Sequence, residues 1–198
     1  MMKRLFAVLA LCSSVLTCAS AQNGAGHYDV LTYSAGSDYG HYLVALESYT
    51  TNGSVYHTKY TDYLYGIAKI LVSEKKLSVV DRSIGFYYDK KENRKDKLFL
   101  GVDIRTASSD FVASEGYEKN GRVMMTKYLK EIMDVLNSCS AVLSENEVKG
   151  VVIGLIWQRG ETKELINVWM LKEDLALFYK GSLTLSELVV RSTVTNTE

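Results

Sequence analysis

Histidine is the side chain most often used for proton transfer near neutral pH and for binding transition metals. The chain has three, His27, His41 and His57, which are 14 and 16 residues apart. Metal sites usually take ligands at much shorter spacings, and no Cys-x-x-Cys pair accompanies these histidines. We therefore predict no metal ion, no cofactor and no catalytic residue for this protein.

Two candidate nucleophiles are weak. Ser37 lies in residues 36–40, G-S-D-Y-G, which has one residue too many for the Gly-x-Ser-x-Gly nucleophile elbow. Cys139 falls at the end of a predicted helix, so we expect a small buried apolar residue rather than a reactive thiol. A hydrolase that uses His41 or His57 is accordingly the least favoured of three functional hypotheses.

Carboxylates offer a further arrangement with the right residue types. Asp81 and Asp103 lie on neighbouring predicted strands, and Arg82 and Arg105 follow nearby. Opposite charges on adjacent strands commonly form cross-strand ion pairs. We predict ion pairs here rather than an acid–base pair.

Tyrosine is the residue type in clearest excess. Of the 14 tyrosines, nine lie between Tyr28 and Tyr65. Tyrosine is enriched in protein interfaces, although it also suits exposed positions on strands. We predict that a tyrosine-rich surface including Tyr33, Tyr39 and Tyr42 contacts a partner protein or a second copy of the chain.

The N-terminal residues have the pattern of an export signal. Basic residues 3–4 precede an apolar run over 5–16 and the small-x-small residues 19–21. We predict a signal peptide over residues 1–21 with cleavage after Ala21. The protein would then be periplasmic or extracellular.

A lipoprotein anchored at Cys18 is the alternative form of export. Cys18 follows a loose version of the lipoprotein sequence, in which Thr17 is larger than the residue usually found there. Cleavage after Ala21 would remove two of the three cysteines and leave Cys139, which excludes an internal disulfide. No later segment is apolar for the ~20 residues that span a bilayer, so we expect no transmembrane segment after signal removal.

Charge argues against a nucleic-acid partner. The full chain has 23 basic and 23 acidic residues, and removal of residues 1–21 leaves 21 and 23. Nucleic-acid binding depends on an excess of Lys and Arg. We therefore expect protein partners or self-association.

Apolar periodicity predicts the elements that would position these residues. The predicted strands cover residues 27–33, 41–50, 80–89, 97–105, 148–158, 165–171 and 175–179. The predicted helices cover 58–75 and 123–139, and the capping-box spacing of Thr184 and Glu187 predicts a short helix before a polar tail. Asn52-Gly53 predicts a turn, and the highly charged residues 89–97 predict a solvated hairpin tip.

One segment of the sequence recurs. Residues 52–60 and 120–128 share six of nine positions at an offset of 68. This match could mark a duplication of a helix–strand–strand unit, with repeats over 52–111 and 120–179. An offset of 65 also aligns the two helices, so a shared amphipathic pattern is the other explanation.

Together these elements predict an α+β fold. We expect a single two-layer domain over residues 22–198, with a mostly antiparallel sheet and two main helices on one face. The favoured function is that of an exported, non-enzymatic protein of the periplasm or envelope, which acts through protein–protein contacts in a structural or assembly role. The alternative is a domain that binds a small molecule or glycan in a cavity lined by Trp157 and Trp169.

Overall fold

The computed structural model describes residues 29–32, 45–48, 51–80, 83–87, 97–110 and 114–197. Its elements run in the order β1 (Asp29–Thr32), β2 (Ala45–Ser48), α2 (Thr51–Lys59), α3 (Thr61–Lys69), η2 (Ile70–Glu74), β3 (Ser78–Val79), β4 (Gly85–Tyr87), β5 (Leu98–Arg105), η3 (Ser108–Asp110), α4 (Tyr117–Asn137), α5 (Ser140–Leu143), β6 (Val148–Arg159), β7 (Thr162–Leu171), α6 (Lys172–Tyr179), α7 (Leu185–Arg191) and β8 (Thr193–Thr197).

The main sheet has six strands in the order β3-β5-β6-β7-β8, with β4 also paired to β5. Only the β5–β6 pair among these is parallel; the others are antiparallel. A parallel pair needs a crossover connection, and α4 provides it. The predicted α+β class with a mostly antiparallel sheet is confirmed.

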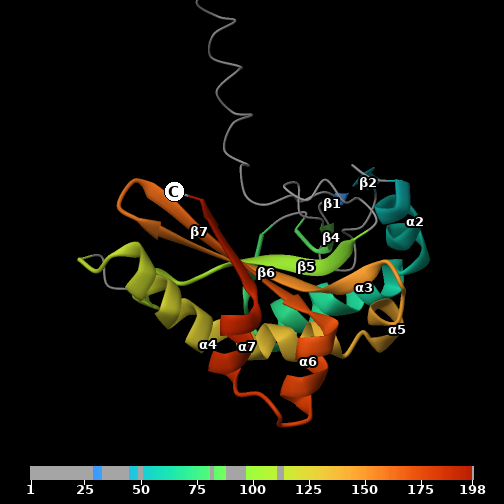
Figure 1. The fold of residues 1–198 in the computed structure, drawn as a ribbon. Coiled ribbons are helices and arrows are strands. Elements are labelled where there is room, and N and C mark those ends of the chain that lie inside the picture. Colours follow the sequence, from blue (N-terminus) through green and yellow to red (C-terminus); the bar gives the residue numbers. More distant parts are fainter. Residues whose placement is uncertain are drawn as a thin grey trace, which may run out of the picture.

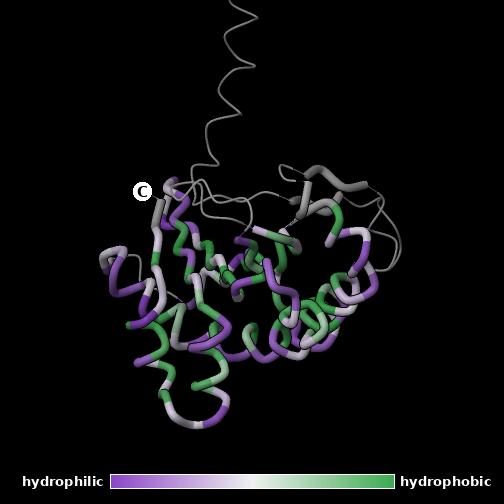
Figure 2. The backbone as a smooth tube through the Cα atoms, turned by 45° about the vertical axis from the view of Figure 1, so that its right-hand side comes forward, coloured by the Kyte–Doolittle hydropathy of each residue, from purple (hydrophilic) through white to green (hydrophobic). Residues whose placement is uncertain are grey.

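Helices form a layer on one side of this sheet. Figure 1 shows α3, α4, α6 and α7 on the same side, with the β1–β2 pair on the other side near β4. The two predicted helices are the main part of this layer, and α6 and α7 extend it beneath β7. The central strands are mainly hydrophobic, whereas the turns at the periphery are mainly hydrophilic (Figure 2).

The core lies between the helices and the sheet. Six of its apolar side chains are at most 1% exposed: Leu64, Ile67, Leu129, Ile132, Ile153 and Leu155. They belong to one large cluster that joins α3 and α4 to β6. The alternation along β6 sends Ile153 and Leu155 toward the helices and Val152 and Gly154 toward the opposite face.

The turn predicted at Asn52-Gly53 is wrong. These residues lie inside α2, and the matching Asn120-Gly121 lies inside α4. Gly121 faces the sheet, where a Cβ would sit 3.4 Å from Ile166 Cδ1 and 3.8 Å from the Trp157 ring. In α4 the glycine therefore serves close helix–sheet packing, and tertiary contacts outweigh its local turn preference.

The strand predicted over residues 175–179 is also wrong, because this segment is α6. Leu175 is buried and Phe178 packs against the core at helical spacing. Gly181 has φ 77° and its amide donates to the Phe178 carbonyl at 2.9 Å, which is a glycine C-cap. A short apolar run can form either a strand or a helix. Here Glu173 and Asp174 lie in the first turn of α6, where acidic side chains are favoured by the helix dipole.

The C-terminal prediction is partly confirmed. Thr184 and Glu187 form the predicted capping box at the start of α7, with the Glu187 amide donating to Thr184 Oγ1 at 3.2 Å. The residues after α7 are not a polar tail, because Thr193–Thr197 form β8 beside β7. Threonine and valine are β-branched and favour strands. The segment is too polar, however, to show the apolar alternation by which a strand is predicted.

Of the predicted strand over 80–89, the described residues form β4 only at 85–87, and β3 lies just before the predicted start. The two strands pair with opposite halves of β5. β6 and β7 form an antiparallel hairpin, and Gly160 has φ 61° in the turn between them. The charged tip of the β4–β5 hairpin lies largely outside the described residues.

Candidate functional site

Most residues with predicted roles lie outside the described part of the chain. Tyr33, Tyr39 and Tyr42 are among them, as are His27 and His41. The predicted interaction surface therefore stays a prediction.

His57 is the predicted catalytic candidate that the structure does describe. Its side chain is fully buried on α2 and packs edge-on against Phe86, with ring centroids 5.4 Å apart. A general base must reach a substrate or a water molecule. The burial of His57 in the core does not favour a hydrolase that uses it.

Cys139 behaves as the small buried residue that the sequence predicts. It is 6% exposed, and burial raises the pKa of its thiol, so the reactive thiolate is disfavoured. It contributes to an open hollow of about 280 Å³ between α3, η2 and the end of α4. The hollow is lined by Asp62, Tyr63, Gly66, Ile67, Ile70, Ser138 and Cys139.

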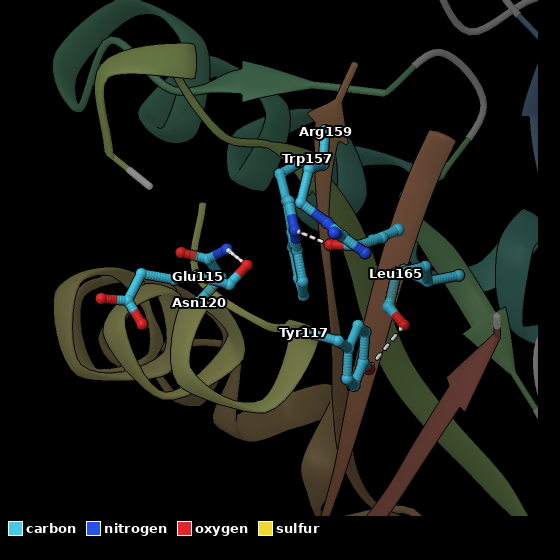
Figure 3. A network of polar contacts seen from close by, with 7 residues as sticks. Glu115, Tyr117, Asn120, Trp157, Arg159 and Leu165 are labelled. Atoms are coloured by element: carbon cyan, nitrogen blue, oxygen red, sulfur yellow. Dashed lines mark hydrogen bonds and ion pairs between the residues drawn. The ribbon is translucent and has the colours of Figure 1, made fainter. Parts of the chain in front are cut away.

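A polar network closes one end of the core (Figure 3). The Trp157 indole N–H donates to Glu164, and Arg159 Nε donates to the same carboxylate at 2.7 Å. The Tyr117 ring stacks on Trp157, with centroids 5.4 Å apart, and its hydroxyl donates to the Leu165 carbonyl at 3.0 Å. Glu164 is 3% exposed, and its charge is matched by Arg159. The network is internally satisfied, which is typical of a structural role.

The two tryptophans cannot line one cavity. Trp157 belongs to the helix-side core, whereas Trp169 belongs to a separate cluster with Tyr87, Phe99 and Val152 on the opposite face. In the described part of the chain, the two side chains therefore lie on opposite faces of the sheet.

Both copies of the repeated sequence end in a lysine–tyrosine pair that holds a carboxylate. Lys59 Nζ donates to Glu145 at 2.5 Å, and the Tyr60 hydroxyl donates to the same oxygen. These hydrogen bonds, from Lys59 first, lower the Glu145 pKa. The contact joins the end of α2 to the loop that precedes β6.

The second pair acts in the same way on Asp110. Lys127 and Tyr128 both donate to its carboxylate, and each lysine also lies over the ring of its neighbouring tyrosine. Burial would raise the Asp110 pKa, but these hydrogen bonds bring it below the ordinary value. The pairs thus fix two loops against helices, and duplication stays one of two explanations for their similarity.

Asp103 is the acidic residue that stands apart from these satisfied groups. It projects from β5 on the face opposite the helix layer, and burial raises its pKa to about 7, with Lys163 opposing this shift. In the described part of the chain it forms no ion pair, and Arg105 is exposed. Asp81 and Arg82 lie outside the described residues, so the predicted cross-strand ion pairs stay a prediction.

Asn167 lies across Gly154 from Asp103 in the sheet. The register aligns Asp103 with Gly154, and Gly154 with Asn167, so the two polar side chains flank a glycine. Sequence reasoning missed Asn167 because a single Asn within an apolar strand has no recognisable spacing. The available signal is the alternation in β6, which places Gly150 and Gly154 on one face and large apolar residues on the other.

A second feature of the surface is a set of exposed apolar side chains in the C-terminal third of the chain. Exposed large apolar side chains gather there, on β7, α6, α7 and β8: Leu171, Leu177, Tyr179, Val190 and Val194. Val190 is 82% exposed and lies just before β8. Exposed apolar side chains of this kind commonly mark contact surfaces.

Across the described ranges, no helix is both long enough and apolar enough to cross a membrane. Within the same ranges, no group of three or more His, Cys, Asp or Glu side chains could hold a metal ion. No protein-family model, no curated protein and no solved structure matches this chain.

Proposed function

We propose that this is an exported, non-enzymatic protein of the periplasm or cell envelope that acts through protein–protein contacts. The observation that supports it best is the outer edge of β8. Within the described residues β8 pairs with β7 alone and ends the sheet. An unpaired edge presents backbone N–H and C=O groups that another strand can bind.

The composition of β8 favours this use of the edge. Natural proteins protect edge strands with proline, lysine, bulges or covering segments. Residues 193–197 are T-V-T-N-T, without charge or proline, and the register with β7 runs unbroken from Thr193 to Thr197. Val194 is 43% exposed, and Val190 beside it in the chain is more exposed. The edge is therefore able to pair and has apolar side chains next to it.

A second copy of the chain is the partner that fits this edge. Antiparallel self-pairing about Thr195 would place Thr193 opposite Thr197, and Thr–Thr pairs are favourable across strands. The lack of charge in β8 removes the repulsion that identical strands would otherwise suffer. The two sheets would join into one through a two-fold axis.

Sedimentation of the exported chain over a range of concentrations tests the proposal. We expect a dimer that dissociates on dilution. Val194→Lys places one positive charge on β8 of each copy, so the two edges would repel each other. We expect this variant to be a monomer with an unchanged melting temperature. Val72→Lys is the matched control, since Val72 is 41% exposed on η2 away from β8; it should dimerise normally.

Two results would contradict this assignment. A wild-type chain that is monomeric at every concentration would reject self-association. A dimer that survives Val194→Lys but is lost when Tyr33, Tyr39 and Tyr42 are replaced by Ala would place the contact in the tyrosine-rich segment instead.

Small-molecule or glycan binding is the alternative function. The observation that favours it is the polar pair Asp103 and Asn167 on the second face of the sheet, beside aromatic side chains.

A further inference from the structure

The open hollow of about 280 Å³ between α3, η2 and the end of α4 has an apolar floor. Ile67 and Cys139 line it and are only 1% and 6% exposed. Ile70 adds a half-buried aliphatic side chain to the same lining. Small-molecule sites usually enclose about 300–1,000 Å³, so this hollow fits a ligand of only a few non-hydrogen atoms.

Two features of the α3–η2 backbone distinguish the hollow from ordinary helix packing. Gly66 lines it, and a Cβ built on this residue would meet no atom within 4 Å. The next turn is π-helical, and the Lys75 amide donates to the Ile70 carbonyl, five residues earlier, at 2.9 Å. Single π-helical turns within α-helices often occur at functional sites. The space beside Gly66 is therefore left open in an element of unusual geometry.

The rim of the hollow is polar and has hydrogen-bond acceptors. Asp62 and Ser138 are the exposed polar residues of its lining, beside the exposed Tyr63, and none of the residues that line it is basic. The Ser138 hydroxyl donates to the Val135 carbonyl at 2.6 Å, so its oxygen can still accept a hydrogen bond. Asp62 and Ser138 therefore both suit a ligand that donates hydrogen bonds.

Negative charge at the rim is not balanced by the described residues. Among them, Asp62 has no ion-pair partner. On η2 and α4, Lys75 pairs with Glu131 at 3.4 Å and Lys130 pairs with Asp134 at 2.7 Å, so these lysines are engaged elsewhere. The helix α4 has 21 residues and no basic residue in its last turn, which leaves the negative end of its dipole uncompensated. A cation is the ligand that complements this rim.

We propose that this hollow binds a small primary amine, whose ammonium group lies at the rim beside Asp62 and whose apolar chain lies on the floor formed by Ile67, Ile70 and Cys139. The ammonium group is attracted by the carboxylate and by the carbonyl end of α4. A ligand with a carboxylate in place of the ammonium group is repelled by both. The site does not depend on the contact proposed at β8, because no residue of β8 lines the hollow.

Titration calorimetry with hexylammonium tests the site, using the exported chain. Hexanol and hexanoate are the matched neutral and anionic probes. We expect saturable binding of hexylammonium, roughly three- to fivefold weaker binding of hexanol, and weaker binding still of hexanoate, because an exposed carboxylate contributes modestly. The preference for the amine should shrink in about 1 M salt, which screens the charges. Hexanol that binds as tightly as hexylammonium would overturn the proposal, as would no binding of the amine at millimolar concentration.

Two variants assign the binding to this hollow. Asp62→Asn should lower the affinity for hexylammonium to that for hexanol and leave hexanol binding unchanged. Gly66→Leu should fill the open space and abolish binding of both probes without lowering the melting temperature, since leucine favours a helix more than glycine does. Glu74→Gln removes an exposed carboxylate of η2 outside the hollow, so this control should bind both probes like wild type. Unchanged binding by the Gly66→Leu variant would reject the site.

Discussion

Three carboxylates of this chain have the same chemistry but very different environments. Glu145 and Asp110 each receive hydrogen bonds from a lysine and a tyrosine, which lower their pKa. Asp103 receives none from the described residues, and burial raises its pKa. The first two carboxylates stabilise the fold as anions, whereas Asp103 costs free energy when it ionises.

Asp103 should therefore make stability fall as pH rises. Its pKa is about 7 in the folded chain against 3.8 for the unfolded reference. Between these values the folded state holds the proton more tightly, so the free energy of unfolding decreases with rising pH and levels off above about 7. Asp103→Asn mimics the protonated form. It should equal wild type at pH 4 and exceed it at pH 8 by roughly 1–4 kcal/mol, measured by urea denaturation.

The control for this experiment is Asp62→Asn, which removes an exposed carboxylate from α3 and shows whether the loss of any acidic side chain has the same effect. If Asp103→Asn kept the same slope as wild type, then Asp103 would be ionised in the folded protein at low pH. That result would contradict the raised pKa of Asp103 in the folded chain.

The burial of apolar side chains was predictable from the sequence. Cys139 is buried as predicted. Leu64 and Ile132, which lie on the predicted helices, are buried as well, because an apolar stripe fixes which side of a helix faces the core. The pairing of Asp103 with Asn167 was not predictable. It depends on the register between β5, β6 and β7, and no local pattern encodes the register of distant strands.

At the scale of elements, α4 is the crossover on which the parallel β5–β6 pair depends. Its inner stripe packs on β6, and Ile132 is fully buried at its centre. Ile132→Ala should lower the free energy of unfolding by about 2–5 kcal/mol, because it removes buried methyl groups and leaves a cavity. Chemical denaturation of the variant and wild type measures the difference.

Val123→Ala on the same helix is the matched control. Val123 is 43% exposed, so its truncation should change stability by less than about 0.5 kcal/mol. A loss below about 1 kcal/mol for Ile132→Ala would mean that the opposite side of α4 faces the sheet.

Elements with long, regular patterns were predictable, and short ones were not. β6 and β7 match the predicted strands within a few residues, and α4 begins at Tyr117, six residues before the predicted start at residue 123. α6 and β8 were missed because their patterns are short. Leu175–Tyr179 fits a strand or a helix, and only the packing of Leu175 and the glycine cap at Gly181 decide between them.

At the scale of the whole molecule, the chain places a helical segment before each antiparallel hairpin. The α2–α3 segment precedes the β4–β5 pair, α4 precedes the β6–β7 pair, and the parallel β5–β6 pairing joins the two units into one sheet. A duplicated helix–strand–strand unit would produce this order. So would two unrelated helices that satisfy the same packing rule for a two-layer domain.

Under the proposed export, the chain that folds is the one without residues 1–21. Residues 1–21 include an apolar run that would be a liability on a folded surface, and Cys139 would be the remaining thiol after their removal. A protein without an internal disulfide must obtain its stability from the core between the helix layer and the sheet. The extent of that core, whose main cluster includes 30 buried residues among those described, is in keeping with this requirement.

The mature chain should begin at Gln22. Signal peptidase selects small residues at the first and third positions before the cut, and Ala21 and Ala19 meet this requirement. Intact-mass measurement of the protein recovered from the periplasm or medium should give the mass of residues 22–198. Ala21→Leu should block this cleavage, whereas Cys18→Ala should leave the mass unchanged. A diacylated chain that starts at Cys18, and that disappears in the Cys18→Ala variant, would instead establish a lipoprotein held at the membrane by its acyl chains.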